Sequence, residues 1–250
     1  MAGHSKWANI KHRKARQDEK RGKMWSKCAR AIIMAARNGG GDPDMNLSLR
    51  YAIDEAKAVN MPKDTIANAV KKGTGDLGGE NYEAVMYEGY GPNGVAILLE
   101  ILTDNRNRTA GELRSILDRA GGNLGPSGCV AFRFTPRGQI FVSKDKVGEE
   151  KIMEAAIEAG AEDVAPEDDA WQILTEPNDF MAVRQALEEA GVEIESAELT
   201  QIPGDTVVCT ADDARKILRL IDTLEDHDDV QKVHANFDVP EEELAALESE

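Results

Sequence analysis

Basic side chains are concentrated at the start of this chain. The first 37 residues contain 11 Lys or Arg and only two acidic residues, Asp18 and Glu19, a net charge of +9. The whole chain of 250 residues carries −16, so the residues after position 37 carry −25. Clustered cations neutralise phosphates, and a basic segment on an acidic chain indicates nucleic-acid contact by one end of the molecule. A solvated basic tail that only aids solubility is the alternative.

Trp7 and His12 are interleaved with the cations of this basic arm, which we define as residues 1–19. Aromatic faces stack on bases, and each such contact contributes about 1–3 kcal/mol where it has been tested. We therefore predict that nucleic acid is bound by residues of the arm and by the cations of the first helix. The predicted contact residues are Lys6, Trp7, Lys11, His12, Arg13, Lys14, Arg16, Lys20, Arg21, Lys23, Lys27 and Arg30.

A second basic pair, Arg106 and Arg108, precedes the expected start of a helix at about Ala110. Free N–H groups at a helix N-terminus attract anions, so the two arginines form a candidate anion site. An ordinary strand-to-helix loop with exposed arginines explains them equally well.

Carboxylates surround His227 in the segment 225–229, and such clusters can bind Mg²⁺ or Ca²⁺. The segment lacks a D-x-D-x-D-G ligand loop, so we interpret it as a solvated acidic turn. No arrangement of nucleophile, base and acid can be placed by spacing. We expect no catalytic residue, no metal and no cofactor; a metal-dependent nuclease that uses these late carboxylates is the competing hypothesis.

Composition favours a soluble, cytoplasmic protein. No apolar run approaches the roughly 18–20 residues that span a bilayer, and no apolar segment follows the basic start as in a signal peptide. An organelle transit peptide is disfavoured by the single Ser among the first 17 residues. Cys28, Cys129 and Cys209 form neither a metal pattern nor a disulfide framework, which fits a reducing compartment.

Three short helices are predicted after the arm. The first has an apolar stripe that includes Trp25 and Ile32 and ends at the glycines 39–41; the others cover about 47–59 and begin at Pro62. Trp25 is expected in the core. Amphipathic helices this short bury their stripes only against each other, so they predict a small helical domain.

Mixed α and β patterns follow a glycine-rich linker at 73–79. Strands are expected at 82–90, 95–103, 170–175, 195–202 and 230–237, and a hairpin at 130–134 and 139–143. Helices are expected at about 110–120, opened by Thr109 in a capping box with Glu112, and at 149–159, 179–190 and 212–224.

The fold class is therefore α+β and multidomain, with a helical domain followed by two α+β domains, the third inserted in the second. Its segments are expected to be the flexible arm at 1–19, a helical domain at 20–75, an α+β domain at 76–145 plus 205–240, an inserted α+β domain at 146–204, and an acidic tail at 241–250.

The segments 3–7, 10–12, 20–23 and 103–109 (Gly-His-Ser-Lys-Trp, Ile-Lys-His, Lys-Arg-Gly-Lys and Thr-Asp-Asn-Arg-Asn-Arg-Thr) resemble the YebC/PmpR family. The resemblance extends over essentially the whole chain in the same order. It implies the three-domain fold and a nucleic-acid-binding regulator that is not an enzyme. The family is usually described as DNA-binding transcriptional regulators, while relatives such as a mitochondrial activator of cytochrome oxidase translation resemble ribosome-associated factors that relieve stalled synthesis.

The partner is therefore expected to be DNA, or ribosomal or transfer RNA on the ribosome. A DNA reader would need a helix-turn-helix, for which the third helix could expose Lys63, Asn68, Lys71 and Lys72. An RNA reader would need only the arm, which would become ordered on a shaped polyanion. As a further partner, the acidic domains could dock a basic protein; no membrane partner is expected.

Overall fold

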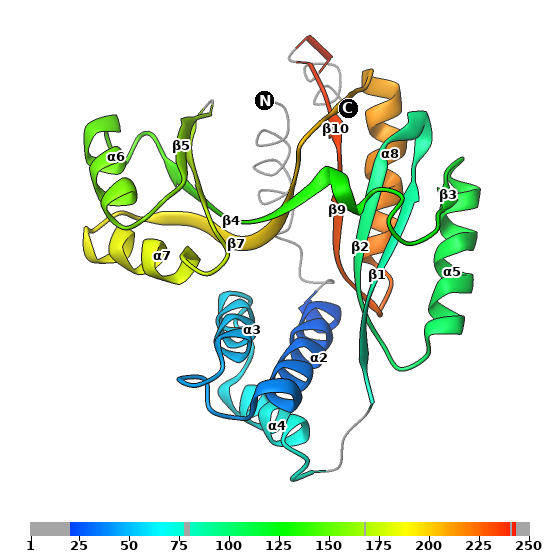
Figure 1. The fold of residues 1–250 in the computed structure, drawn as a ribbon, viewed down its shortest axis with the longest axis horizontal. Coiled ribbons are helices and arrows are strands. Elements are labelled where there is room, and N and C mark those ends of the chain that lie inside the picture. The colour runs from blue at the N-terminus through cyan, green and yellow to red at the C-terminus, as the bar shows by residue number, and fades with distance from the viewer. Residues whose placement is uncertain (1–20, 78–80, 168, 241, 244–250) are drawn as a thin grey trace. The chain divides into compact units, whose positions relative to one another are not determined.

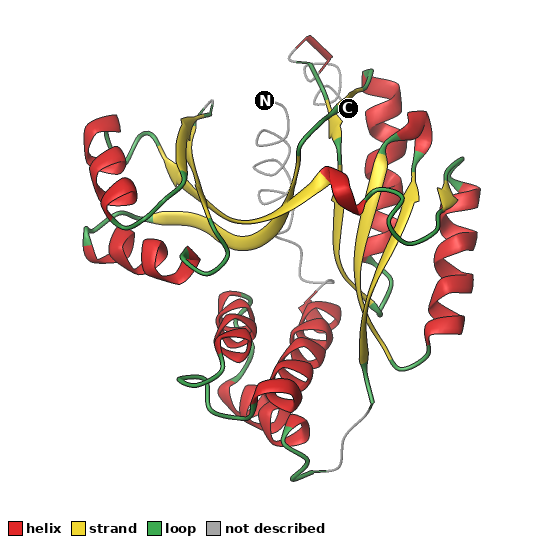
Figure 2. Ribbon diagram, viewed as in Figure 1, coloured by secondary structure: helices red, strands yellow, loops and turns green. Residues whose placement is uncertain are grey.

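The computed structural model describes residues 21–77, 81–167, 169–240 and 242–243 (Figure 1). These residues form two compact units, one made of 21–129 with 215–233 and the other of 130–214 with 234–243. Because 215–233 return to the first unit, the segment 130–214 of the second unit is inserted within the first in chain order. The α+β multidomain fold is thus confirmed, and Figure 2 shows its helices and strands. None of the described helices is long and apolar enough to cross a membrane.

The first unit begins with three helices, α2 (Arg21–Gly39), α3 (Leu47–Ala58) and α4 (Lys63–Gly73). Their apolar faces meet in one core cluster that contains Ile32, Leu49 and Ile66. Trp25 packs against this cluster, and its indole N–H donates to the backbone carbonyl of Val59 at 3.1 Å, so its predicted core position is confirmed.

Asn46 fixes the turn between α2 and α3. Its side chain caps α3 by accepting a hydrogen bond from the N–H of Leu49, and it donates to the backbone carbonyls of Ala35 and Gly40. A Cβ at Gly39 would lie 2.6 Å from the Asn46 amide nitrogen. The glycine therefore ends α2 where it does because this buried cap must approach the backbone.

Four strands form the first sheet, in the order β3-β1-β2-β9. They are β1 (Glu83–Tyr90), β2 (Ala96–Thr103), β3 (Asn123–Leu124) and β9 (Val230–Ala235). The turn between β1 and β2 is the 3₁₀ segment η2 (Pro92–Gly94), in which Asn93 has φ +58°. β1 and β2 pair antiparallel over their full length.

Two helices accompany this sheet, α5 (Arg106–Arg119) and α8 (Ala211–Glu225). Leu113 and Leu117 of α5 and Ile217 and Leu224 of α8 are fully buried. These apolar rows recur at helical spacing and cover the apolar strand β2, which is buried at seven of its eight positions.

The second sheet has the order β5-β6-β4-β7 and belongs to the second unit. Its strands are β4 (Phe134–Ser143), β5 (Asp163–Pro166), β6 (Ala170–Thr175) and β7 (Ile194–Pro203), and its helices are α6 (Glu149–Glu158) and α7 (Phe180–Glu189). The remaining elements are the 3₁₀ segment η3 (Ala131–Arg133) and the short parallel pair β8 (Val207–Val208) and β10 (Phe237–Asp238).

The predicted hairpin at 130–134 and 139–143 is wrong, because β4 is one continuous strand. It pairs with β7 from Phe134 onward but with β6 only from Gly138 onward. Pro136 therefore has a neighbouring strand on one side only, where its missing N–H does not interrupt a two-sided ladder. The predicted turn at Pro136-Arg137-Gly138 is absent. Gly138 is required by packing instead, because a Cβ there would lie 2.5 Å from the Phe180 ring.

The start of α5 also differs from the expected one. α5 begins at Arg106, with Asn105 as its cap, and Thr109 is a buried residue within its first turn. The capping box at Thr109 and Glu112 is therefore wrong; the side chain of Asn105 instead accepts from the N–H of Arg108 at 3.1 Å.

The expected domain boundaries remain predictions, with one change that follows from strand pairing. The predicted domain 76–145 includes residues 134–143, yet β4 lies between β6 and β7. The inserted segment therefore has to include β4, and its start lies near residue 130 rather than 146.

Candidate nucleic-acid interface

The predicted arm contacts fall outside the described residues. This holds for Lys6, Trp7, Lys11, His12, Arg13, Lys14, Arg16 and Lys20. Arg21 is the first residue of α2. The described part of the predicted interface therefore begins with Lys23, Lys27 and Arg30.

These three cations contact the C-terminal end of α8 and the residues that follow it. Lys23 Nζ donates to the carbonyl of Asp226 at 3.2 Å, and Lys27 Nζ to the carbonyl of Glu225 at 2.5 Å. Arg30 donates to the carbonyl of Asp228 at 2.5 Å. The last carbonyls of a helix carry partial negative charge, so cations at this place stabilise the helix end.

Burial accompanies these contacts. Desolvation lowers the pKa of the Lys27 amine below its usual value, and the nearby carboxylates of Glu225, Asp226 and Asp228 only partly offset this. The Arg30 side chain is 20% exposed. On the cationic face of α2, which the sequence predicts to contact nucleic acid, Lys27 and Arg30 therefore make contacts within the first unit.

Asp229 is the centre of a buried polar network. One of its oxygens accepts from Arg108 at 2.6 Å, from the Thr109 hydroxyl at 2.7 Å and from the Thr103 hydroxyl at 3.1 Å. The other accepts from Arg30 at 3.0 Å. Its side chain is only 4% exposed. Two cations and two hydroxyls thus satisfy a carboxylate that burial would otherwise penalise.

The ionised form of Asp229 is favoured by this network. Burial by itself raises the pKa of the carboxyl, but the hydrogen bonds from Arg108, Thr109 and Thr103 outweigh it, so the pKa lies below its ordinary value. The same hydrogen bond raises the pKa of the Arg108 guanidinium. The pair stays charged at any pH near neutrality.

His227 extends the network toward the solvent. Its Nδ1 accepts from the N–H of Asp229 at 3.1 Å, and its Nε2 lies 2.8 Å from a carboxylate oxygen of Glu112. The acidic segment 225–229 is thus a helix-to-strand turn in which Asp226 and Asp228 are exposed, as expected for a solvated turn, while His227 and Asp229 are held by hydrogen bonds. Within the described ranges, no three His, Cys, Asp or Glu side chains are grouped so as to hold a metal ion.

The candidate anion site at Arg106 and Arg108 is not supported by this geometry. The Arg108 guanidinium is bound by two carboxylates, those of Asp229 and Asp104. Arg106 is exposed, with its guanidinium 3.9 Å from Glu83 and its carbonyl accepting from the Tyr87 hydroxyl. Because these carboxylates already balance the positive charge, the segment 103–109 acts as a structural connection to Asp229.

The helix-turn-helix candidates lie where the pattern placed them. Lys63, Asn68, Lys71 and Lys72 are all exposed on α4. Pro62 precedes this helix as its N-cap, and Asn60 in the preceding turn has φ +56°. The cationic last turn of α4 is therefore exposed to solvent.

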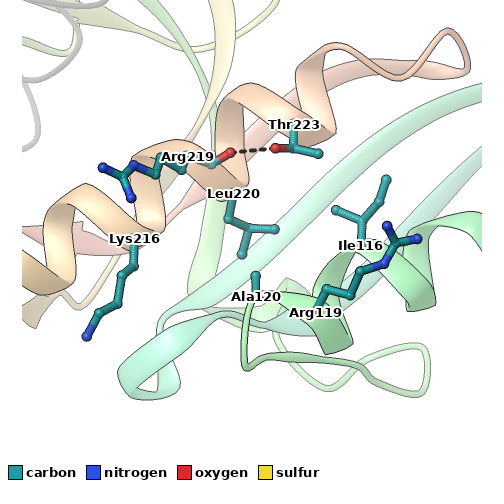
Figure 3. Close-up of a pocket in the computed structure, with 7 residues that line it drawn as sticks. All are labelled: Ile116, Arg119, Ala120, Lys216, Arg219, Leu220 and Thr223. Atoms are coloured by element: carbon teal, nitrogen blue, oxygen red, sulfur yellow. Dashed lines mark hydrogen bonds between the residues drawn. The ribbon is translucent and has the colours of Figure 1, made fainter.

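A groove between α5 and α8 was missed by sequence reasoning (Figure 3). Arg119, Lys216 and Arg219 supply its cations, and its apolar surface comes from Ile116, Ala120 and Leu220. Thr223 completes the lining, and its hydroxyl donates to the carbonyl of Arg219 at 2.7 Å. The spacing of Lys216, Arg219 and Thr223, which puts them on one helix face, was the available signal. The sequence does not show that α5 lies opposite this row of side chains.

The fold and these surfaces define a class: a multidomain α+β protein with cationic surfaces on an acidic chain. Residues 5–76 match the model of the TACO1/YebC protein N-terminal domain, and residues 82–237 match that of the TACO1/YebC second and third domain. The chain belongs to the TACO1/YebC family.

Relatives from several bacteria match over their full length. A protein of Halothermothrix orenii is 53% identical over 253 residues, with 100% of both chains covered, and one of Persephonella marina is 56% identical, with 97% of this chain and 98% of that protein covered. Both are named probable transcriptional regulatory protein. The crystal structure of a conserved hypothetical protein from Aquifex aeolicus superposes with a TM-score of 0.79 at 48% identity, and it covers 90% of this chain and 93% of that one.

Proposed function

We propose that this chain is a non-enzymatic regulator of gene expression that acts by binding nucleic acid. The observation that carries the proposal is the segregation of charge, with +9 in the first 37 residues of a chain whose net charge is −16. The names of the full-length relatives support a regulatory role.

The basic arm is the principal contact in this proposal. Lys27 and Arg30 hold the end of α8, so they contribute less to phosphate binding than the arm does. The exposed Lys63, Lys71 and Lys72 of α4 extend the positive surface. In the transcriptional version of the function, the arm follows the DNA backbone while α4 approaches a groove.

A ribosome-associated role is the second candidate, and the charge of the remaining chain favours it. Residues after position 37 carry −25, so they are repelled along an extended duplex. A folded RNA lined with basic proteins differs, because those proteins can receive the acidic surfaces while the arm reaches phosphates and unstacked bases.

Crosslinking in cells, followed by sequencing of both the bound DNA and the bound RNA, tests the proposal. The matched control is the full chain with Lys11→Glu, Arg13→Glu and Lys14→Glu. Enrichment of either nucleic acid that this control loses supports the function. Equal recovery of both from the wild type and the control would overturn it.

Sedimentation separates the two versions. Lysate is centrifuged through sucrose at about 0.15 M salt, where exposed charges more than about 8 Å apart are screened. Co-sedimentation with ribosomes that depends on the arm favours the translational role. Wild-type protein that stays at the top of the gradient while it occupies defined promoter DNA favours the transcriptional one.

A further inference from the structure

The groove between α5 and α8 combines a positive rim with an apolar floor. In Figure 3, Leu220 of α8 points toward Ala120, the C-cap of α5, and Lys216 extends away from α8. The Arg119 side chain lies back along α5, where its guanidinium donates to Ser115. Leu220 is 2% exposed, whereas Arg119, Lys216 and Arg219 are all exposed. None of the seven described residues that line the groove is acidic.

This concentration of cations is unusual for its part of the chain. Residues 146–250 contain 7 basic and 30 acidic side chains, and three of the seven basic ones, Arg215, Lys216 and Arg219, lie within five positions of α8. Nearly half of the basic side chains in this acidic region therefore lie on one segment of α8, and two of them line the groove.

The helix dipole explains only one of these positions. A cation near a helix C-terminus interacts favourably with the helix dipole, which accounts for Arg119 in the last turn of α5. Lys216 is the sixth residue of α8, in its N-terminal half, where the dipole disfavours a positive charge. The helix dipole therefore does not account for Lys216, although Asp212 and Asp213 lie four and three residues before it in α8, at a spacing that allows ion pairs.

Arg119 is held in place without loss of its charge. Its Nη2 and Nε donate to the Ser115 hydroxyl at 2.6 and 3.2 Å, and its Nε also donates to the Ser115 carbonyl. These partners are neutral, so the guanidinium remains available for an anion. A guanidinium fixed in this way binds a phosphate with less loss of side-chain freedom.

The size of the groove fits one nucleotide-sized group. Its volume is about 360 Å³, near the lower end of the range that holds small organic ligands. Ile116 and Ala120 are only partly buried and offer an apolar surface for a base or sugar, beneath which Leu220 is buried. The cations lie around this surface for the phosphates. A duplex keeps its bases stacked inside, so this floor serves only a strand whose bases are exposed.

We infer that the α5–α8 groove is a second nucleic-acid contact, which takes the sugar-phosphate backbone and one unstacked base of a single strand. The inference rests on the proposed function, because it assumes that the chain binds nucleic acid through its arm. The arm supplies attraction, and the groove favours a single strand over a duplex.

The test uses the full chain with Arg119→Gln, Lys216→Gln and Arg219→Gln. The matched control has Lys57→Gln, Lys151→Gln and Arg184→Gln, which removes the same charge from other helices. Thermal unfolding confirms that both variants are folded. Affinity for a labelled 12-nucleotide RNA is measured over a series of salt concentrations, alongside a duplex of the same sequence and a mononucleotide.

The groove variant should bind the single strand roughly tenfold more weakly than the control, with a salt slope lower by about 2, as expected when three phosphate contacts are lost. Affinity for the duplex should change no more than in the control. RNA that contains 4-thiouridine should crosslink to peptides from 114–123 or 215–224 in the wild type and in the control.

The outcomes separate the groove from the proposed function. Wild-type protein that binds no nucleic acid would overturn both. A groove variant with the affinity and salt slope of the control, or crosslinks confined to residues 1–37, would overturn the groove alone. Saturable mononucleotide binding that the groove variant loses, with unchanged strand binding, would show a small-molecule site and would also overturn the inference.

Discussion

The carboxylate of Asp229 lies 2.6 Å from the guanidinium of Arg108, although 121 positions separate the two residues in the chain. The same carboxylate reaches Arg30 of α2 at 3.0 Å. It therefore connects three segments of the first unit, namely the helical region, the start of α5 and the strand β9. Removal of one partner from such a buried ion pair destabilises the fold, because the other partner is left as a buried charge without compensation.

Replacement of Asp229 should destabilise the protein strongly. Asp229→Asn leaves two arginines without their buried counter-charge, and we expect a loss of about 2–4 kcal/mol in the free energy of unfolding. Asp228→Asn, one residue earlier and exposed, is the control and should change it by less than about 0.5 kcal/mol. Urea unfolding followed by circular dichroism measures both. Equal effects would mean that the network contributes little.

The contribution of Asp229 should depend on pH in one direction. Its pKa in the folded protein lies below the unfolded value of about 3.9, so the ionised form stabilises the fold. That stabilisation is fully present above about pH 5 and is lost as the pH falls through the folded-state pKa. The difference in unfolding free energy between the wild type and Asp229→Asn should therefore shrink between pH 5 and pH 3. A difference that grows toward low pH would show that burial, not hydrogen bonding, controls the pKa.

The segment 103–109 shows what sequence reasoning found at this site and what it missed. The motif drew attention to Arg106 and Arg108, but local spacing predicted an anion there because the negative partner could not be seen. Asp229 was recognised only as one acid in a polar run. Its burial follows from the pairing of β9 beside β2, a contact between distant segments that no short-range pattern encodes.

Elements with strong periodicity were predicted well, and weak ones were not. The helices α2, α3 and α7 and the strands β1, β2 and β6 lie within one or two residues of their expected bounds. β5, β8 and β10 have four, two and two residues, too short for an alternating pattern to show. The hairpin was predicted because Pro-Arg-Gly has the composition of a turn. In the structure β6 does not reach Pro136, so the missing N–H of this proline interrupts no strand pairing on that side and the strand continues through it.

The cations of α2 should differ in their effect on stability. Arg30→Gln removes a partner of buried Asp229 and a guanidinium 5.4 Å above the Tyr82 ring, so we expect a loss of about 1–2 kcal/mol. Lys23→Gln removes only an exposed 3.2 Å hydrogen bond and should cost less than about 0.5 kcal/mol. Chemical unfolding of the two variants compares them. If Lys23→Gln proved the more damaging, the assignment of roles within α2 would be reversed.

Charge reversal in the basic arm should separate binding from folding. Lys11→Glu, Arg13→Glu and Lys14→Glu are expected to leave the melting temperature nearly unchanged, since surface charges contribute little to a fold. Polyanion binding should be lost, and any residual binding should have a salt slope lower by at least about 2. Fluorescence anisotropy with labelled RNA and DNA measures both quantities. Retention of the wild-type slope would place the main contact elsewhere in the chain.

The extent of the inserted segment can be tested by two deletions. The sequence places the insertion at 146–204, but its removal leaves β4 without β6 and β7, the strands on either side of it. This ten-residue strand would then be unpaired. It contains Ile140, Phe141 and Val142, which are fully or almost fully buried in the intact fold, so it would expose apolar surface and favour aggregation.

Deletion of 134–203 removes the second sheet as a whole. With a short glycine-serine linker between the ends, the first unit keeps β1, β2, β3 and β9 together with α5 and α8, and we expect one cooperative unfolding transition. The 146–204 deletion should instead unfold broadly and bind a hydrophobic dye. Calorimetry distinguishes the two, and a sharp transition for the shorter deletion alone would return the boundary to residue 146.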